Sequence, residues 1–367
     1  ERERIFHLQT PNTSYVIQLI KDVVPVHLYW GRRLRPVALE RLLRKAGYHI
    51  PTPFLEDRSI SFETLQLEYP GYGTGDFRQP AYQVQLADGT TAIELLYESH
   101  RIYRGKPALE GLPATYVESD EEAETLELVL VNRYAGLKAV VMYTVFENHD
   151  AIARSVRFLN ESGQDIRLLR ALSASVDFPD NRYDLLQLSG AWLRERYIER
   201  RRLAPGMQGV ESRLGVSSHQ HNPFLALLSP DADENHGDVY AFNLVYSGSF
   251  TAQAEVEQYG TTRVTIGIDP FDFTWLLKPG ASFQTPEAIL VYSGEGLSAM
   301  SRTFHRLYRT RLCRGIHRDQ PRPVLINNWE ATYFNFDEAK LLEIVEAARP
   351  LGIELFVLDD GWFGKRN

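Results

Sequence analysis

The chain has 367 residues, of which 44% are hydrophobic and 24% charged, and its formal net charge is -8. This composition is typical of a globular protein with more than one domain, and the negative charge argues against a nucleic-acid-binding surface. A single cysteine, Cys313, excludes an intramolecular disulfide, and no signal peptide or membrane-spanning apolar run is evident. We therefore expect a cytoplasmic protein with neither nucleic-acid nor membrane partners.

Residues 1 to about 295 are dominated by short runs in which apolar and polar residues alternate. Gly, Pro, Asn and Asp separate these runs. The pattern predicts many antiparallel strands, and hence a large N-terminal β-sandwich domain over residues 1–295. The clearest expected strands are 14–19, 82–86, 126–131, 139–146, 152–158 and 263–268.

Two early segments break this pattern. Residues 37–46 have the spacing of a short helix, which Gly47 would end. Residues 51–59, which include Arg58, form an irregular stretch bracketed by prolines. Such loops often reach a ligand or a neighbouring subunit, but a plain surface loop is the more common outcome.

At Gly296 the spacing of apolar residues changes to that of an amphipathic helix, with arginines on the opposite face. We predict a linker helix region over residues 296–320, with Cys313 as a small core residue. The basic run is expected to be a solvated face, because no other basic patch supports nucleic-acid binding. The apolar stripe consists of Leu297, Met300, Phe304, Leu307, Tyr308 and Leu312.

Residues 321–367 have the pattern of a strand, a helix and a second strand. Residues 324–326 and 353–358 are apolar runs, as in strands that are buried on both faces. Asp337 can cap the intervening helix, which runs to about Ala348, and Gly352 follows it. We predict the first β-α-β unit of a (β/α)8 barrel, joined by a right-handed crossover.

Polar and aromatic residues follow both of these strands. Trp329 lies just after the first, and Asp359 and Asp360 end the second. In a parallel barrel, the carboxyl ends of the strands form the active-site face. Carboxylates there could accept hydrogen bonds from sugar hydroxyls, beside an apolar ring of Trp362. Two alternatives remain. The two aspartates could instead form a helix cap followed by a turn glycine, and Trp329 could only fill the mouth of the barrel.

Two further patterns receive a structural interpretation. His219 and His221 invite a metal site, but no further ligand at suitable spacing accompanies them, so we expect no metal. Residues 71–75 match no nucleotide-binding motif and are expected to form a turn, and no cofactor is implied. Trp192 lies among charged residues and is expected to be partly buried at most.

Several motifs together resemble glycoside hydrolase family 36, the bacterial α-galactosidases of the raffinose and melibiose type. The resemblance implies a large N-terminal β-sandwich (a supersandwich), a (β/α)8 barrel, a C-terminal β domain and a homotetramer. It also implies retaining hydrolysis of terminal α-galactosyl residues without a cofactor. The matching segments are residues 27–31, 68–78, 219–224, 327–332 and 358–363.

The resemblance also implies roles for individual residues. Asp359 and Asp360 match residues that bind galactose hydroxyls, and Trp329 matches one that lines the same pocket. Trp192 matches a galactose-site residue from the N-terminal domain. Arg58 matches a loop that reaches the active site of a neighbouring subunit. The family's nucleophilic and acid/base aspartates match positions beyond Asn367, so this chain alone is expected to be inactive.

Two other functions stay open. The first is galactosyl transfer, as in relatives of the raffinose-synthase type. The second is a non-catalytic carbohydrate-binding β-sandwich protein. The apolar runs 324–326 and 353–358 count against the second alternative, because such strands need partners on both faces.

Overall fold

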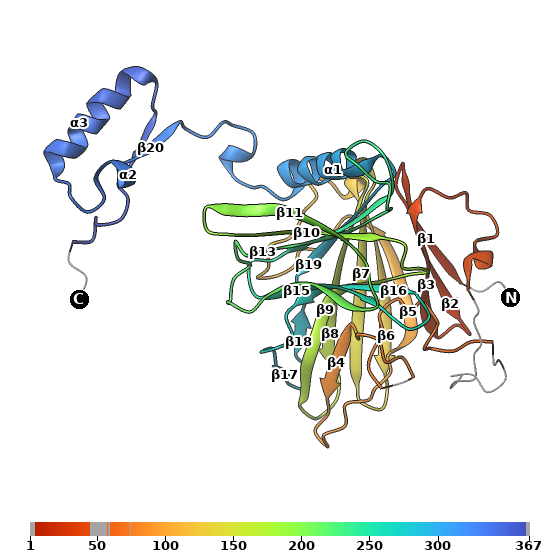
Figure 1. Ribbon diagram of the computed structural model, residues 1–367. Helices are drawn as coiled ribbons and strands as arrows, with labels where there is room; N and C mark the ends of the chain where they lie inside the picture. Colours follow the sequence, from red (N-terminus) through yellow and green to blue (C-terminus); the bar gives the residue numbers. More distant parts are fainter. Residues whose placement is uncertain (1–3, 45–56, 58, 74, 365–367) are drawn as a thin grey trace. The chain divides into compact units, whose positions relative to one another are not determined.

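The computed structural model describes residues 4–44, 57, 59–73 and 75–364 (Figure 1). Two compact units are present, residues 1–312 and 313–367. Among the described residues, no helix has both the length and the apolar character needed to cross a membrane.

The largest element of the first unit is a ten-stranded antiparallel sheet. Its strand order is β11-β10-β13-β14-β19-β8-β7-β6-β5, with β18 also paired to β8. The strands are β5 (Leu96–Arg104), β6 (Glu124–Asn132), β7 (Leu137–Phe146), β8 (Ala151–Asn160), β10 (Asp184–Ala191), β11 (Arg194–Arg202), β13 (His221–Leu228), β14 (Val239–Val245), β18 (Ser282–Gln284) and β19 (Glu287–Ser293).

The described residues of this unit also form two smaller antiparallel sheets. The six-stranded sheet has the order β12-β15-β16-β9-β17, with β4 paired to β9, and the three-stranded sheet has the order β1-β2-β3. Their strands are β4 (Tyr82–Gln85), β9 (Ile166–Phe178), β12 (Gly206–Ser212), β15 (Phe250–Val256), β16 (Thr262–Ile268) and β17 (Trp275–Leu277), then β1 (Ile5–Gln9), β2 (Thr13–Ile20) and β3 (Val24–Arg32). Every strand expected most clearly from the sequence coincides with an observed strand.

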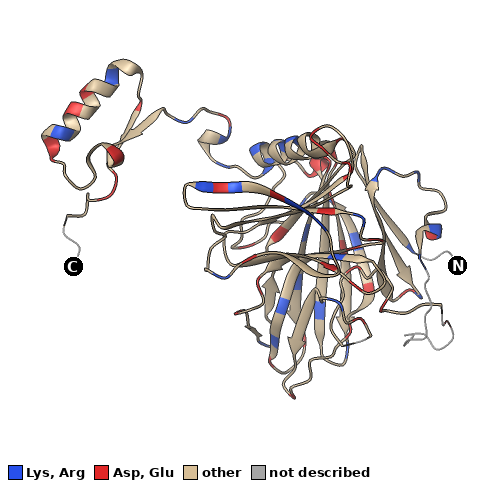
Figure 2. Cartoon of the chain, viewed as in Figure 1, with Lys and Arg blue, Asp and Glu red and all other residues tan. Residues whose placement is uncertain are grey.

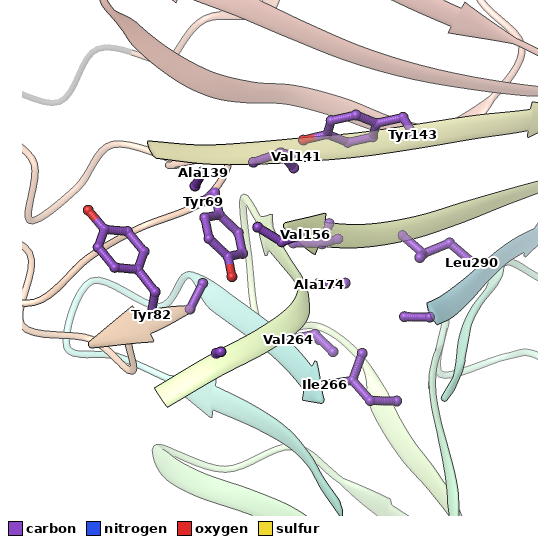
Figure 3. Packing of buried hydrophobic residues seen from close by; sticks show 14 of the residues in the cluster. Tyr69, Tyr82, Ala139, Val141, Tyr143, Val156, Ala174, Val264, Ile266 and Leu290 are labelled. Atoms are coloured by element: carbon purple, nitrogen blue, oxygen red, sulfur yellow. The ribbon is translucent and has the colours of Figure 1, made fainter. Parts of the chain in front are cut away.

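The main hydrophobic core lies between the ten-stranded and six-stranded sheets. Val141 and Val156 extend from one sheet, and Val264 and Ile266 from the other (Figure 3). These side chains are at most 1% exposed. The alternation seen in the sequence therefore buries one face of each sheet against the other, as expected of stacked antiparallel sheets.

The helix predicted from Gly296 is observed as α1 (Gly296–Arg311), which packs on the ten-stranded sheet. Met300, Phe304 and Leu307 are buried, as its apolar stripe predicts. Cys313, however, lies beyond the helix and is exposed, so its prediction as a core residue was wrong.

The early helix is shorter than predicted. The described part of residues 37–46 holds a single 3₁₀ turn, η1 (Leu39–Leu42), and Gly47 lies outside the described residues. Leu39 is the one side chain of this turn that is buried, and it offers little packing to stabilise a longer helix. The remaining 3₁₀ turns of this unit are η2 (Asp120–Glu122) and η3 (Glu147–His149).

Two clusters of buried charged residues lie inside the first unit. In one, the carboxylate of Glu68 accepts hydrogen bonds from the hydroxyls of Tyr15 and Tyr143, both at 2.6 Å. Arg154 pairs with the same carboxylate at 3.1 Å, and His27 lies 3.3 Å from it. Burial would raise the pKa of Glu68, but the charge of Arg154 and the hydrogen bonds outweigh it and lower the pKa.

The second cluster contains two carboxylates and two guanidinium groups. Arg263 donates to Asp177 at 2.6 Å and to Asp76 at 2.7 Å, and Arg78 donates to Asp76 at 2.8 Å. Burial opposes ionisation of Asp76, but the two arginines outweigh it and hold the pKa of Asp76 below its ordinary value. Both clusters join residues 68–78 to strands of the packed sheets. Glu68, Asp76 and Arg78 of this motif thus have a structural role.

The second unit is a β-α-β arrangement. Its strands β20 (Leu325–Asn327) and β21 (Leu355–Val357) pair in parallel, with Leu325 opposite Leu355. Between them lie α2 (Trp329–Thr332), α3 (Glu338–Ala348) and η5 (Arg349–Leu351), and η4 (Ile316–Arg318) precedes them. The Asp337 side chain caps α3 by accepting from the Lys340 amide at 2.9 Å, as predicted.

Candidate functional site

The polar residues that follow β20 and β21 lie together, because the two strands run parallel and in register. Asn327 is opposite Val357, so both strands end at the same edge of the sheet. The Asn327 side-chain amide donates to the Asp359 carboxylate at 2.7 Å. The predicted meeting of the two strand ends is therefore present in the second unit.

Further hydrogen bonds hold this edge in one geometry. The Asn328 side-chain oxygen accepts from the Asp359 backbone amide at 2.9 Å, and its amide donates to the Thr332 hydroxyl at 2.9 Å. Asn328 is fully buried, whereas Asp359 and Asp360 are partly exposed. The buried side-chain amide of Asn328 therefore links the end of β21 to α2 and holds the backbone at Asp359 in position.

A shallow cavity of about 500 Å³ opens at this edge. Asp359 and Asp360 line it together with Trp329 and Trp362, and Trp362 is 70% exposed. Carboxylate oxygens beside exposed indole rings can accept hydrogen bonds from hydroxyl groups while an apolar ring face stacks on the indole. The chemistry of the cavity thus suits a sugar.

The structural alternative for the Asp-Asp-Gly sequence is also partly present. Asp359 accepts from the Asp360 backbone amide at 2.7 Å, and Gly361 has a positive φ of 101°. A Cβ at Gly361 would lie 3.1 Å from ring atoms of Phe334 and Phe336. The turn therefore needs glycine for both its backbone conformation and its close packing. Asp359 serves this turn and lines the cavity at the same time.

Two further residues were predicted to belong to the site, Trp192 and Arg58. Trp192 belongs to the first unit, where it forms the tip of the β10–β11 hairpin and is 76% exposed. The next residue, Leu193, is also exposed and has a positive φ of 67°. An exposed indole on a hairpin tip is available for contact with a ligand or another protein surface. Arg58 lies outside the described residues.

The two histidines do not share one strand face. β13 begins at His221, and His219 precedes it in an exposed turn. The His221 ring lies 3.1 Å from the Ser189 hydroxyl, and burial lowers the pKa of His221. Among the residues that the structure describes, no group of three or more His, Cys, Asp or Glu is placed to hold a metal ion.

Sequence reasoning missed the role of Asn328. Its position in the Asn-Asn-Trp sequence indicated only a polar strand end, and the hydrogen bond to the Asp359 amide depends on pairing with a strand about thirty residues later. The available signal was the second asparagine of a pair placed between an apolar strand and a helix. The side-chain oxygen of an asparagine at this position can accept the hydrogen bond that a backbone carbonyl of a paired strand would otherwise accept.

A large antiparallel β domain is followed by a parallel unit whose strand ends carry carboxylates and tryptophans, the side chains that suit a sugar. Comparison with known families agrees with this chemistry. Residues 24–278 match the glycosyl hydrolase family 36 N-terminal domain, and residues 282–367 match melibiase. The chain belongs to glycosyl hydrolase family 36.

Known relatives resemble the chain over almost its whole length. It is 57% identical over 366 residues to alpha-galactosidase AgaA of Geobacillus stearothermophilus, covering 99% of this chain and 50% of that protein. It is 41% identical to alpha-galactosidase 1 of Pediococcus pentosaceus, over 100% of this chain and 50% of that protein. The chain therefore spans about half the length of the curated relatives it matches.

Solved structures agree with the fold. The crystal structure of AgaA superposes with a TM-score of 0.97 at 56% identity, covering 99% of this chain and 51% of that chain. Structures of AgaA variants have been solved in complex with raffinose and with stachyose.

Proposed function

We propose that this chain contributes the galactose-holding part of an α-galactosidase that releases terminal α-galactosyl residues from raffinose-type oligosaccharides and melibiose. The observation that carries the proposal is the cavity formed by Asp359, Asp360 and Trp329 in a chain 57% identical to an alpha-galactosidase. The raffinose and stachyose complexes of a relative support the substrate class.

The proposed roles follow from the chemistry of the cavity. Asp359 and Asp360 accept hydrogen bonds from galactose hydroxyls, and Trp329 offers its indole to the apolar face of the ring. The hydrogen bond from Asn327 holds the Asp359 carboxylate in place before the sugar arrives, which reduces the ordering needed on binding. Trp192 and Arg58 are proposed as further substrate contacts.

We further propose that residues 1–295 form the family's supersandwich and that residues 321–367 begin a (β/α)8 barrel, with residues 296–320 between them. Exposed apolar residues in the second unit support the barrel. Leu325 is 51% exposed and Leu355 40%, although strands of this type are normally covered on both faces. Further strands and helices of a barrel would cover these residues.

Catalysis is proposed to follow the family's retaining route. One carboxylate attacks the anomeric carbon, and a second carboxyl group first protonates the leaving oxygen and then activates water. We assign neither role to Asp359 or Asp360. We also propose a homotetramer in the cytoplasm, the latter because the sequence has only one cysteine and hence no intramolecular disulfide.

The test is hydrolysis of a nitrophenyl α-galactoside by the complete gene product and by this 367-residue chain alone. We expect the complete product to release nitrophenol and to yield α-galactose first, as proton NMR of the anomeric signal would show. The chain alone should be inactive. Turnover by the chain alone would contradict the division of roles, and β-galactose as first product would contradict the retaining route.

The same reactions distinguish hydrolysis from galactosyl transfer. With raffinose as donor, hydrolysis releases free galactose, whereas transfer produces longer oligosaccharides. We expect free galactose as the main product. Predominant oligosaccharide formation would instead assign the complete gene product to the galactosyl-transferring relatives.

A further inference from the structure

Four arginines line a polar cavity of about 480 Å³ in the first unit. Arg32 ends β3 and Arg33 follows it, while Arg302 and Arg306 lie on α1. Figure 2 shows the basic residues along this helix. All four guanidinium-bearing side chains are exposed. The cavity therefore gathers positive charge from two elements that are far apart in the sequence.

The carboxylates of the cavity do not neutralise these arginines. Two carboxylates line it among the described residues, those of Asp150 and Glu295. Asp150 is occupied by uncharged donors, the Thr10 hydroxyl and the Asn12 amide, the latter at 2.9 Å. Glu295 precedes α1 and is exposed. Asp238 does not line the cavity, but its charge acts on Arg32. Even with Asp238 counted, three carboxylates beside four arginines leave an excess of positive charge.

Two arginines of the cavity, Arg33 and Arg306, contact uncharged groups. Arg33 donates to the Pro11 carbonyl at 3.5 Å, and Arg306 to the Thr303 hydroxyl at 3.4 Å. In contrast, Arg311 on the same helix donates to both carboxylate oxygens of Glu122, at 2.6 and 2.7 Å. Among the described residues, Arg311 of α1 therefore pairs with a carboxylate, whereas Arg302 and Arg306, which face the cavity, do not.

Arg32 is held beside the cavity wall. A hydrogen bond with the Tyr292 side chain raises the pKa of Arg32, and the charge of Asp238 adds to this effect at longer range. The Tyr292 hydroxyl itself donates to Asp238 at 2.6 Å. A Cβ at Gly294 would lie 3.0 Å from both the Arg32 guanidinium and the Tyr292 hydroxyl, so glycine keeps this space open.

The local sequence of α1 makes the arrangement unfavourable without a ligand. Arg302 and Arg306 are four residues apart, so their like charges lie on one face of the helix and repel each other. Residues 296–311 contain no acidic residue that could offset this repulsion. The first amides of the helix already donate to backbone carbonyls of residues 233, 234 and 237. An anion here would therefore be held by the guanidinium groups.

We propose that this cavity binds the phosphate group of a small molecule. Guanidinium forks match the geometry of phosphate oxygens and form charge-assisted hydrogen bonds with them. The volume lies within the range of small-molecule sites. Inorganic phosphate and a sugar phosphate present the same chemical group, so the site recognises that group in either source. The proposal does not depend on the glycosidase activity.

The test is isothermal titration calorimetry of this chain at low ionic strength, with inorganic phosphate in one arm and galactose 1-phosphate in the other. The variants are Arg302→Gln and Arg32→Gln. Arg309→Gln is the matched control, because Arg309 is an exposed arginine of α1 that does not line the cavity. Melting curves of each variant verify that it is folded.

We expect one phosphate per chain, affinity about tenfold weaker in each cavity variant, and no change in Arg309→Gln. Tighter binding of galactose 1-phosphate than of inorganic phosphate would assign the site to a phosphorylated sugar, and equal affinities would assign it to the phosphate group alone. The proposal fails if the unmodified chain binds neither probe, or if Arg309→Gln weakens binding as much as Arg302→Gln does.

Discussion

Two pairs of aspartates in this chain have opposite surroundings. Asp76 and Asp177 are 1% exposed inside the first unit, and both form ion pairs with Arg263. Asp359 and Asp360 are partly exposed at the end of a strand, beside tryptophans that line a cavity. The buried pair contacts arginines and is closed to solvent, whereas the strand-end pair is accessible to a ligand.

The largest effect that this comparison predicts is on stability. Arg263→Met should leave Asp76 and Asp177 with much of their counter-charge removed, because Arg263 contacts both. The loss of one partner from a buried ionic group costs about 3–5 kcal/mol of unfolding free energy. Urea denaturation of Arg263→Met and of the unmodified chain measures this difference in unfolding free energy.

The matched control is Arg104→Met, which removes a pair with Glu121 whose side chains are 67% and 70% exposed. This control should unfold at nearly the same urea concentration as the unmodified chain. If Arg263→Met proves too unstable to purify, Arg263→Lys keeps the charge and should show a smaller loss. Equal stability of Arg263→Met and Arg104→Met would remove the distinction between buried and exposed pairs.

The second prediction concerns pH. The pKa of Glu68 in the folded chain lies below its ordinary value of 4.5, and that of Asp76 below 3.8. Their ionised forms therefore stabilise the fold above those ordinary values, and this stabilisation is lost as the pH falls through the lower folded-state pKa values. The unfolding free energy should fall steadily below about pH 4.5.

Glu68→Gln isolates one contribution to that pH dependence. The variant should be less stable at pH 7, because Arg154 loses its partner carboxylate, and its stability should vary less with pH below 4.5. Urea denaturation at a series of pH values measures both effects. If the unfolding free energy of Glu68→Gln depends on pH below 4.5 as strongly as that of the unmodified chain, a lowered pKa of Glu68 does not contribute to the pH dependence.

The third prediction moves to the strand ends. Asp360→Asn should weaken galactose binding by the complete gene product about tenfold to a hundredfold, because hydrogen bonds to a charged acceptor are stronger than those to an amide. Stability should change little at this partly exposed position. Asp319→Asn is the control, an exposed aspartate of the same unit that pairs with Arg318. Equal galactose affinities for the two variants would contradict a binding role for Asp360.

The smallest expected effect belongs to Trp192. Because this side chain is 76% exposed, Trp192→Ala should change the unfolding free energy by less than about 0.5 kcal/mol. If it contacts substrate as proposed, KM for raffinose should nevertheless rise in the complete gene product. Trp275→Ala, at a second exposed tryptophan, provides the comparison. The same KM in both variants would limit the sugar contacts to the cavity of the second unit.

Much of this molecule follows from local sequence patterns. Alternation of apolar and polar residues located the strands of the packed sheets, and helical spacing located α1 and its buried stripe. Both patterns are reliable because one face of each element must be buried. The short 3₁₀ turn at residues 39–42 and the exposed Cys313 were less predictable, because packing and not local spacing decides where a helix ends.

For the site, the sequence by itself determined which residue types stand at the ends of β20 and β21, and parallel pairing made their meeting predictable. Only the tertiary structure decided how they are held: Asn327 donates to the Asp359 carboxylate, and Asn328 accepts from the Asp359 backbone amide. It also decided that Glu68, Asp76 and Asp177 are buried with arginines. The reason is physical: a carboxylate has the same local sequence signal in either place, and its partners come from strands that only folding brings together.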